Sequence, residues 1–226
     1  MHISAGRLVA GGVLCLFLAA APAAGQTASS GFYVGARAGT AEMETPTVRD
    51  REGPGLLGFD RRDRTWSVFG GHEWLVRAPL RVGVEIGYSD NGAATITYAS
   101  TNTYAFASTQ LDVLTTAAVT YRRLVIGFQA GVGRTREQYR ISTYVTGTPD
   151  IDSDQTRDLP VGGISVGYQV TRRLAAFVNV RRTFGDVADT VTKALVSSNP
   201  TPPPYRDVLN SVSRVTAVSF GLRIGL

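Results

Sequence analysis

The sequence is poor in the residues that carry most enzymatic and metal-binding chemistry. It contains one cysteine, Cys15, and two histidines, His2 and His72. Cys15 and His2 fall in an N-terminal segment that we expect to be removed, so the mature chain would have no disulfide and no thiol chemistry. It would also lack a histidine pair for a metal site, and it has neither zinc-ligand spacing nor a phosphate-binding glycine loop.

Long apolar runs are missing after the first 25 residues. A membrane-spanning helix needs about 20 consecutive apolar residues, and the only comparable run, residues 8–20, is shorter and follows a short basic start. Small residues after this run favour cleavage before Ala24 or Gln26. The sequence therefore predicts a signal peptide over residues 1–25 and an exported domain over residues 26–226, in preference to a transmembrane anchor or a lipoprotein.

Lysine is almost absent, since Lys193 is the sole lysine and arginine supplies nearly all of the positive charge. The formal net charge of the whole chain is +5. A basic protein could bind nucleic acid, but here the arginines are scattered over predicted strands, turns and loops, and they do not cluster on a helix. Anionic lipid headgroups are the more natural partner of such an exported chain.

Alternation of apolar with small or polar residues is what the sequence has in abundance, and residues 215–226 show it most clearly. Val218, Phe220, Leu222 and Ile224 share one parity, while Arg223 and small residues share the other. Successive side chains of a strand point to opposite faces, so this segment has one apolar side. An exposed apolar edge strand invites aggregation in water, whereas the outside of a membrane barrel must be apolar.

A C-terminal strand of this kind resembles the assembly signal of bacterial outer-membrane β-barrels. That signal usually ends in Phe or Trp, but this chain ends in Leu226, and Phe220 is the nearest aromatic residue on the same face. The rest of the chain is similar to small OmpA-like or porin-like barrel proteins. The resemblance implies location in the outer membrane of a Gram-negative-type bacterium. It also implies recognition by the β-barrel assembly machinery through the last strand.

Eight alternating segments predict an all-β fold, an eight-stranded antiparallel up-and-down transmembrane β-barrel. The predicted strands are residues 31–39, 65–75, 81–88, 110–121, 124–133, 161–170, 174–183 and 215–226. Short turns alternate with four long polar segments, residues 40–62, 89–108, 138–158 and 186–205, and residues 89–108 are expected to include strand extensions beyond the bilayer. Because outer-membrane barrels have short periplasmic turns and long outer loops, we expect the long segments at the cell surface and both termini in the periplasm.

Aromatic residues on the predicted lipid-facing side lie near the ends of the strands. Four fall near the short-turn end, namely Phe32, Trp74, Tyr121 and Tyr168, and two near the long-loop end, Trp66 and Tyr88. We interpret them as the two aromatic girdles of a membrane barrel. The alternative is that large aromatic residues simply favour strands.

The opposite parity carries charges of both signs from six of the eight strands. These predicted lumen residues are Arg37, Glu73, Arg81, Glu85, Asp112, Arg181 and Arg223. The interior of an eight-stranded barrel is barely wider than its side chains, so these charges must pair or bind water. They could form a gated pore or an ion-pair network that plugs the lumen, and we favour the plug.

Acidic residues at alternate positions, Asp150, Asp152 and Asp154, resemble the start of a calcium-binding loop. However, Gln155 stands where an EF-hand needs glycine, and Val161 takes the place of its bidentate glutamate. We therefore favour a solvated acidic turn. The sequence does not decide whether these three carboxylates bind a cation.

Catalytic residues are hard to find in the predicted mature chain. His72 shares the parity of Trp74 and should face lipid, and no histidine–serine cluster matches the barrels that modify lipid A. We expect a non-enzymatic, monomeric protein without a cofactor, with a structural or surface-interaction role among outer-membrane lipid and lipopolysaccharide. The alternatives are a passive porin for small solutes and a lipid-modifying enzyme.

Overall fold

The computed structural model describes residues 30–44, 47–49, 56–98, 102–143, 151–185, 190–192 and 214–226. The expected signal peptide lies outside these residues. In the described part of the chain, no helix is long and apolar enough to cross a membrane.

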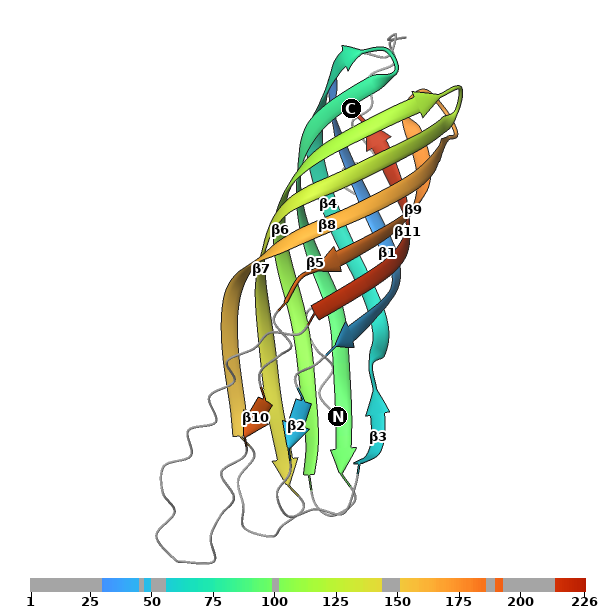
Figure 1. Cartoon of the computed structure of the whole chain (residues 1–226). Helices are drawn as coiled ribbons and strands as arrows, with labels where there is room; N and C mark the ends of the chain where they lie inside the picture. The colour runs from blue at the N-terminus through green and yellow to red at the C-terminus, as the bar shows by residue number, and fades with distance from the viewer. Residues whose placement is uncertain are drawn as a thin grey trace, which may run out of the picture.

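Eight long strands close into an antiparallel barrel, which confirms the predicted fold class (Figure 1). They are β1 (Gly31–Glu44), β4 (Arg62–Arg77), β5 (Leu80–Tyr98), β6 (Asn102–Tyr121), β7 (Leu124–Thr143), β8 (Ile151–Gln169), β9 (Leu174–Thr183) and β11 (Arg214–Gly225). Each strand pairs with its neighbours along the chain, and β11 pairs with β1 to complete the ring. The first strand therefore begins, and the last one ends, at the same end as the short turns.

Three short strands accompany the barrel. β3 (Leu56–Asp60) pairs with the far end of β5 and so prolongs the position of β4 in the sheet. β2 (Thr47–Arg49) and β10 (Thr190–Thr192) form a separate two-stranded parallel sheet. Figure 1 shows them beyond the closed barrel, at the end opposite the turns.

The strands reach well beyond their predicted limits. The prediction of long loops over residues 40–62 and 138–158 was wrong in large part, whereas β5 and β6 extend into residues 89–108 as expected. β5 pairs with β6 as far as Thr97, and β7 pairs with β8 as far as Ile141. The polar composition of these segments indicated loops, but an antiparallel ladder joins backbone groups whatever the side chains are. Threonine and tyrosine also favour strands. Most of the predicted loop over residues 186–205 lies outside the described residues.

The short turns fall where the sequence predicted them, between β4 and β5, β6 and β7, and β8 and β9. In the second of these turns, Arg122 has a φ angle of 56°. This left-handed conformation suits glycine and is unfavourable for a residue with a Cβ atom. We call this end of the barrel the turn end and the opposite end the loop end.

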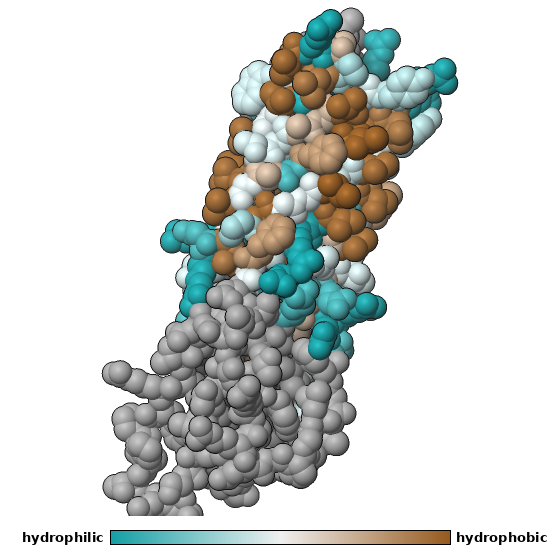
Figure 2. All heavy atoms as spheres, in the orientation of Figure 1, coloured by the Kyte–Doolittle hydropathy of each residue, from teal (hydrophilic) through white to brown (hydrophobic). Residues whose placement is uncertain are grey.

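The outer wall of the barrel carries an apolar belt (Figure 2). In that view the belt lies between hydrophilic side chains at the turn end and a second hydrophilic zone toward the loop end. Members of the belt such as Ile86, Val113, Phe128, Ile164 and Phe220 are exposed. A continuous apolar surface of this kind is what a barrel presents to hydrocarbon.

Glycines on the inner wall make room for large side chains from neighbouring strands. Gly71 on β4 is paired with Tyr33 on β1, and the tyrosine ring lies against it. A Cβ atom at Gly71 would stand 2.6 Å from the Tyr33 hydroxyl oxygen and 2.4 Å from the Val84 carbonyl oxygen. The adjacent Gly70 is different, because its Cβ would have nothing nearer than the Tyr33 carbonyl oxygen at 3.5 Å.

This difference gives a matched test of the packing inside the barrel. We expect Gly71→Ala to lower the free energy of unfolding by about 1–3 kcal/mol, because the added methyl group overpacks the lumen. Gly70→Ala should change it by less than about 0.5 kcal/mol. Urea unfolding in lipid vesicles, followed by the loss of the compact unheated gel band, measures both. Equal effects of the two substitutions would contradict the packing described here.

Candidate functional site in the barrel lumen

Nearest the turn end, two arginines share one carboxylate inside the barrel. Arg223 Nη1 on β11 donates to Glu73 Oε1 on β4 at 2.5 Å, and Arg81 Nη1 on β5 lies 3.7 Å from Glu73 Oε2. The Arg223 guanidinium also lies over the Tyr33 ring, 4.8 Å from its centre. β11 shares no backbone ladder with β4 or β5, and this carboxylate joins it to both strands through charge.

Deeper in the lumen, Glu85 on β5 is buried and accepts several hydrogen bonds. The Tyr33 hydroxyl donates to Glu85 Oε2 at 3.1 Å. Gln129 Nε2 lies 3.3 Å from Oε1 and 3.5 Å from Oε2 of the same carboxylate. Arg37 Nη2 stands 3.8 Å from Glu85 Oε1 and supplies the opposite charge. Hydrogen bonds and an ion pair of this kind offset the cost of burying a carboxylate.

Arg37 on β1 contacts side chains on the adjacent strand β4 and on β9, two strands away. Its Nε donates to Ser67 Oγ at 2.6 Å, and its Nη1 donates to Asn179 Oδ1 at 3.4 Å. Within the described part of the chain, Arg37 Nη2 has no hydrogen-bond partner. Arg37 borders a cavity of about 50 Å³ that is also lined by Glu85 and Gln129 and by the rings of Phe69 and Phe177. Such a cavity has room for a few water molecules.

A third ion pair lies closer to the loop end and is the most deeply buried. Arg181 Nη1 on β9 donates to Asp112 Oδ2 on β6, and Arg181 Nη2 donates to the hydroxyl of Ser89 on β5. Asp112 is fully buried and Arg181 is 4% exposed. β6 and β9 are not neighbours in the sheet, so this pair crosses the interior from wall to wall.

The structure brings together all seven lumen residues that the sequence singled out, in three ion-paired groups. The predicted ion-pair network was limited to charged residues, and neutral side chains complete their hydrogen bonds. These neutral partners are Tyr33, Ser67, Ser89, Gln129 and Asn179, of which Gln129 and Asn179 share the parity that was predicted to face the lumen. Their inward parity was available in the sequence, but parity gives no information on which side chains meet across the barrel.

Beyond the third ion pair the interior becomes apolar, which sequence reasoning missed. Small and apolar side chains from β1, β5 and β11 pack together there: Ala41, Met43, Ala94, Val215 and Ala217. Phe106 and Tyr139 add two buried rings with centres 5.1 Å apart. Most of these residues fell in segments predicted to be loops. The available signal was their alternation with charged residues, as at Ala41-Glu42-Met43-Glu44.

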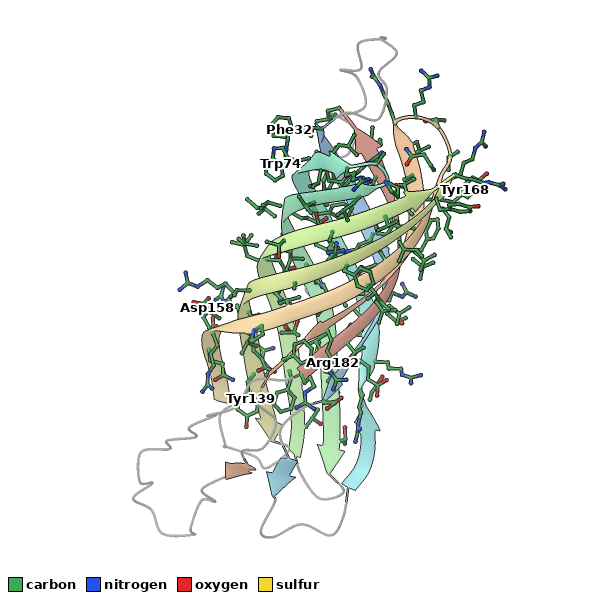
Figure 3. All side chains as sticks on the ribbon, turned by 45° about the horizontal axis from the view of Figure 1, so that its top comes forward. Phe32, Trp74, Tyr139, Asp158, Tyr168 and Arg182 are labelled. Carbon is green, nitrogen blue, oxygen red and sulfur yellow. The ribbon has the colours of Figure 1, made fainter. Side chains whose placement is uncertain are left out.

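The predicted girdle residues all lie on the outer wall. At the turn end, Phe32, Trp74 and Tyr168 project outward, whereas Asp158 and Arg182 lie toward the loop end (Figure 3). His72 lies between two of these rings, with ring centres 4.5 Å from Phe32 and 4.6 Å from Trp74. Tyr121 is also exposed at the turn end. Trp66 and Tyr88 pair toward the loop end, with ring centres 5.8 Å apart.

Outside the lumen, arginines beyond the apolar belt at the loop end are paired with acidic side chains. The pairs are Arg62–Glu42, Arg182–Glu44, Arg214–Glu44, Arg134–Asp158 and Arg136–Asp154. Hydrogen bonds from Arg136 hold the pKa of the Asp154 carboxyl below its ordinary value. Asp150 lies outside the described residues, and Asp152 belongs to β8. Over the described ranges, no group of three or more His, Cys, Asp or Glu residues is placed to hold a metal ion.

The chain is similar to known proteins over most of its length. The family model of the OmpA-like transmembrane domain matches residues 27–221. Among solved structures, Neisserial surface protein A is similar at 17% identity and a TM-score of 0.44, with 88% of this chain and 99% of that chain covered. No curated protein matches the sequence significantly.

Two further solved structures have the same level of similarity. The attachment invasion locus protein Ail of Yersinia pestis is 8% identical with a TM-score of 0.46, covering 87% of this chain and 97% of that chain. The outer membrane protein OprG from Pseudomonas aeruginosa is 9% identical with a TM-score of 0.46, covering 88% and 98%.

The buried Asp112–Arg181 pair makes a sharp prediction for stability. Asp112→Ala should lower the free energy of unfolding by about 3–5 kcal/mol, because it leaves the Arg181 charge buried without its partner. Asp158→Ala is the matched control, since it removes a carboxylate from an exposed pair with Arg134 and should have little effect. Denaturant unfolding followed by tryptophan fluorescence measures both. A loss at Asp158 as large as that at Asp112 would show that the burial of the lumen pair is not what stabilises the barrel.

Proposed function

The chain belongs to the OmpA-like transmembrane domain family, and from that premise we propose that it is an integral outer-membrane protein with a structural or surface-interaction role. In this proposal the barrel anchors the chain and contributes to membrane integrity. The strand extensions and connections at the loop end meet the environment outside the cell. The lumen is plugged by its ion pairs and does not serve as a solute channel.

The wall-to-wall contact of Arg181 with Asp112 is the observation that carries this proposal. It joins opposite sides of the interior, and an apolar layer around Met43 and Ala217 lies directly beyond it. On the turn-end side, Glu85 and Glu73 are each held by arginines from other strands. A hydrated ion would have to break charge pairs and then cross apolar packing, and both steps are costly.

A passive porin is the second candidate function, and one observation favours it. The cavity beside Arg37 is lined by Glu85 and Gln129 as well as by apolar side chains. A rearrangement of these side chains would extend a hydrated space toward the turn end. The apolar layer at the other end of the lumen opposes this alternative.

The outer wall supports lipid as the main partner of the barrel. The apolar belt suits hydrocarbon, and the paired charges beyond it at the loop end would lie at the level of lipopolysaccharide headgroups. We propose no catalytic role for His72, because its ring is packed between Phe32 and Trp74 on the lipid side. We further propose that the chain acts as a monomer without a cofactor and enters the membrane through assembly machinery that recognises β11.

Electrical measurement tests the plug directly. Wild-type protein in planar bilayers should show little or no steady conductance, because the lumen is filled. Glu85→Ala should lower the temperature at which the unheated gel band shifts, since it removes the main partner of the buried Arg37. Glu42→Ala, in the exposed pair with Arg62, is the control. A large open conductance of the wild type, with the heat shift of Glu85→Ala unchanged, would favour the porin.

Chemical labelling of intact cells tests the orientation. A cysteine in place of Thr156, on the loop-end part of β8, should react with a membrane-impermeant maleimide. A cysteine in place of Arg122, in the turn between β6 and β7, should react only after the outer membrane is opened. The mature chain is expected to have no other cysteine, so the background is low. Preferential labelling at position 122 on intact cells would reverse the proposed orientation.

A further inference from the structure

The two rims of the barrel differ in how their arginines are neutralised. At the loop end, five arginines each have an acidic partner on another strand, whereas the exposed Arg64 has none among the described residues. At the turn end, four exposed arginines lie in or beside the three turns: Arg77, Arg122, Arg123 and Arg172. Within the part of the chain that the structure describes, none of these four forms an ion pair with an acidic side chain. We call them the turn-end arginines.

The acidic side chain on the strands at this end, Glu73, does not neutralise the turn-end arginines. Glu73 points into the lumen and is shared by Arg223 and Arg81. The turn-end arginines are therefore free to bind anions from outside the chain. The question is whether those anions are soluble or belong to the membrane.

The side chains of two turn-end arginines lie against the lipid-facing wall. Arg123 Nη1 donates to the Tyr168 hydroxyl at 3.3 Å, and the Arg122 guanidinium lies 5.6 Å from the centre of the Tyr121 ring. Both rings are exposed at the edge of the apolar belt, where Leu124 also lies. Figure 3 shows Tyr168 projecting outward at this rim. The guanidinium groups are thus held at the depth where hydrocarbon gives way to headgroups.

The backbone of the second turn adds an independent observation. Arg122 occupies the left-handed region at a φ of 56°, where glycine would be relaxed and a residue with a Cβ atom is strained. A strained residue at a turn is a reason to look for a role of its side chain. Here the side chain carries a charge at the edge of the lipid-facing belt.

We propose that the turn-end arginines form a docking surface for anionic phospholipid headgroups in the adjacent leaflet. Guanidinium groups bind phosphate oxygens through paired donors, and tyrosine rings beside them fit the interfacial zone. The inference deepens the proposed function, because it rests on insertion of the barrel in a bilayer. It gives the two rims different partners, with mutual ion pairs at the loop end and lipid phosphate at the turn end.

The test uses the full-length mature protein in phosphatidylcholine vesicles that contain a trace of spin-labelled phosphatidylglycerol or spin-labelled phosphatidylcholine. Wild-type protein should restrict the anionic probe about fivefold or more in preference to the neutral one, the effect expected of even one arginine beside an anionic surface. About 1 M salt should reduce the preference, because it shortens the screening length to about 3 Å.

Three variants separate the turn-end arginines from other causes. Arg122→Gln/Arg123→Gln should lose most of the preference, whereas Arg134→Gln/Arg136→Gln, which removes two paired arginines at the other rim, should keep it. Arg122→Gly should weaken the preference while relaxing the backbone, so its effect cannot be assigned to a damaged fold. An equal loss in the two double variants would overturn the proposal.

Other anions are distinguished within the same experiment. If inorganic phosphate at constant ionic strength abolishes the preference, the arginines bind the soluble anion in preference to lipid phosphate. If wild type shows no lipid preference but detergent-solubilised protein sediments with murein sacculi through the same arginines, the partner is an anionic polymer. A wild-type barrel that inserts, gives a heat-shifted band and shows no preference refutes this inference alone. Failure to insert would refute the proposed function.

Discussion

Hydrogen bonding of the backbone in a solvent that offers no partners is the constraint on which this structure depends. Hydrocarbon cannot satisfy an N–H or C=O group, so a sheet that crosses it must have no free edge. The pairing of β1 with β11, from Tyr33 opposite Gly225 to Glu44 opposite Arg214, removes the last edge. The alternation of apolar and polar residues follows, because each strand of a closed barrel has one side in lipid and the other in the lumen.

Closure at eight strands leaves an interior that side chains must fill, and this determines the chemistry of the lumen. Each large inward side chain needs space on a neighbouring strand, as Tyr33 finds beside Gly71. Each inward charge needs a partner because water is limited, as Arg181 finds in Asp112. The contact of Arg181 with Asp112 joins two strands that share no backbone ladder, so it fixes the cross-section of the barrel as well as its electrostatics.

The sequence was sufficient for the fold class and for the membrane-spanning part of every strand, because lipid imposes an apolar parity that can be read residue by residue. It was insufficient for the ion pairs. The contact of Arg223 with Glu73 depends on the register between β4, β1 and β11. Parity shows which face of a strand a residue occupies, but not how far along the barrel axis it lies. It also failed for the extension of β1 beyond residue 39, where the outward residues Glu42 and Glu44 are charged and the inward residue Met43 is apolar.

That failure has a physical cause, which is that the polarity of the wall reverses along the strands. On β1 and β11, Thr40 pairs with Val218 on the lipid side, and two residues further Glu42 pairs with Thr216. Over the same interval the interior changes from Arg37 to Ala41 and Ala217. Where hydrocarbon covers the outside, burial of apolar groups in the lumen contributes little to the stability of the fold, so the lumen can be polar. Where water covers the outside, the hydrophobic effect favours an apolar interior. One continuous sheet is therefore stabilised as a membrane barrel at one end and as a water-soluble β-structure at the other.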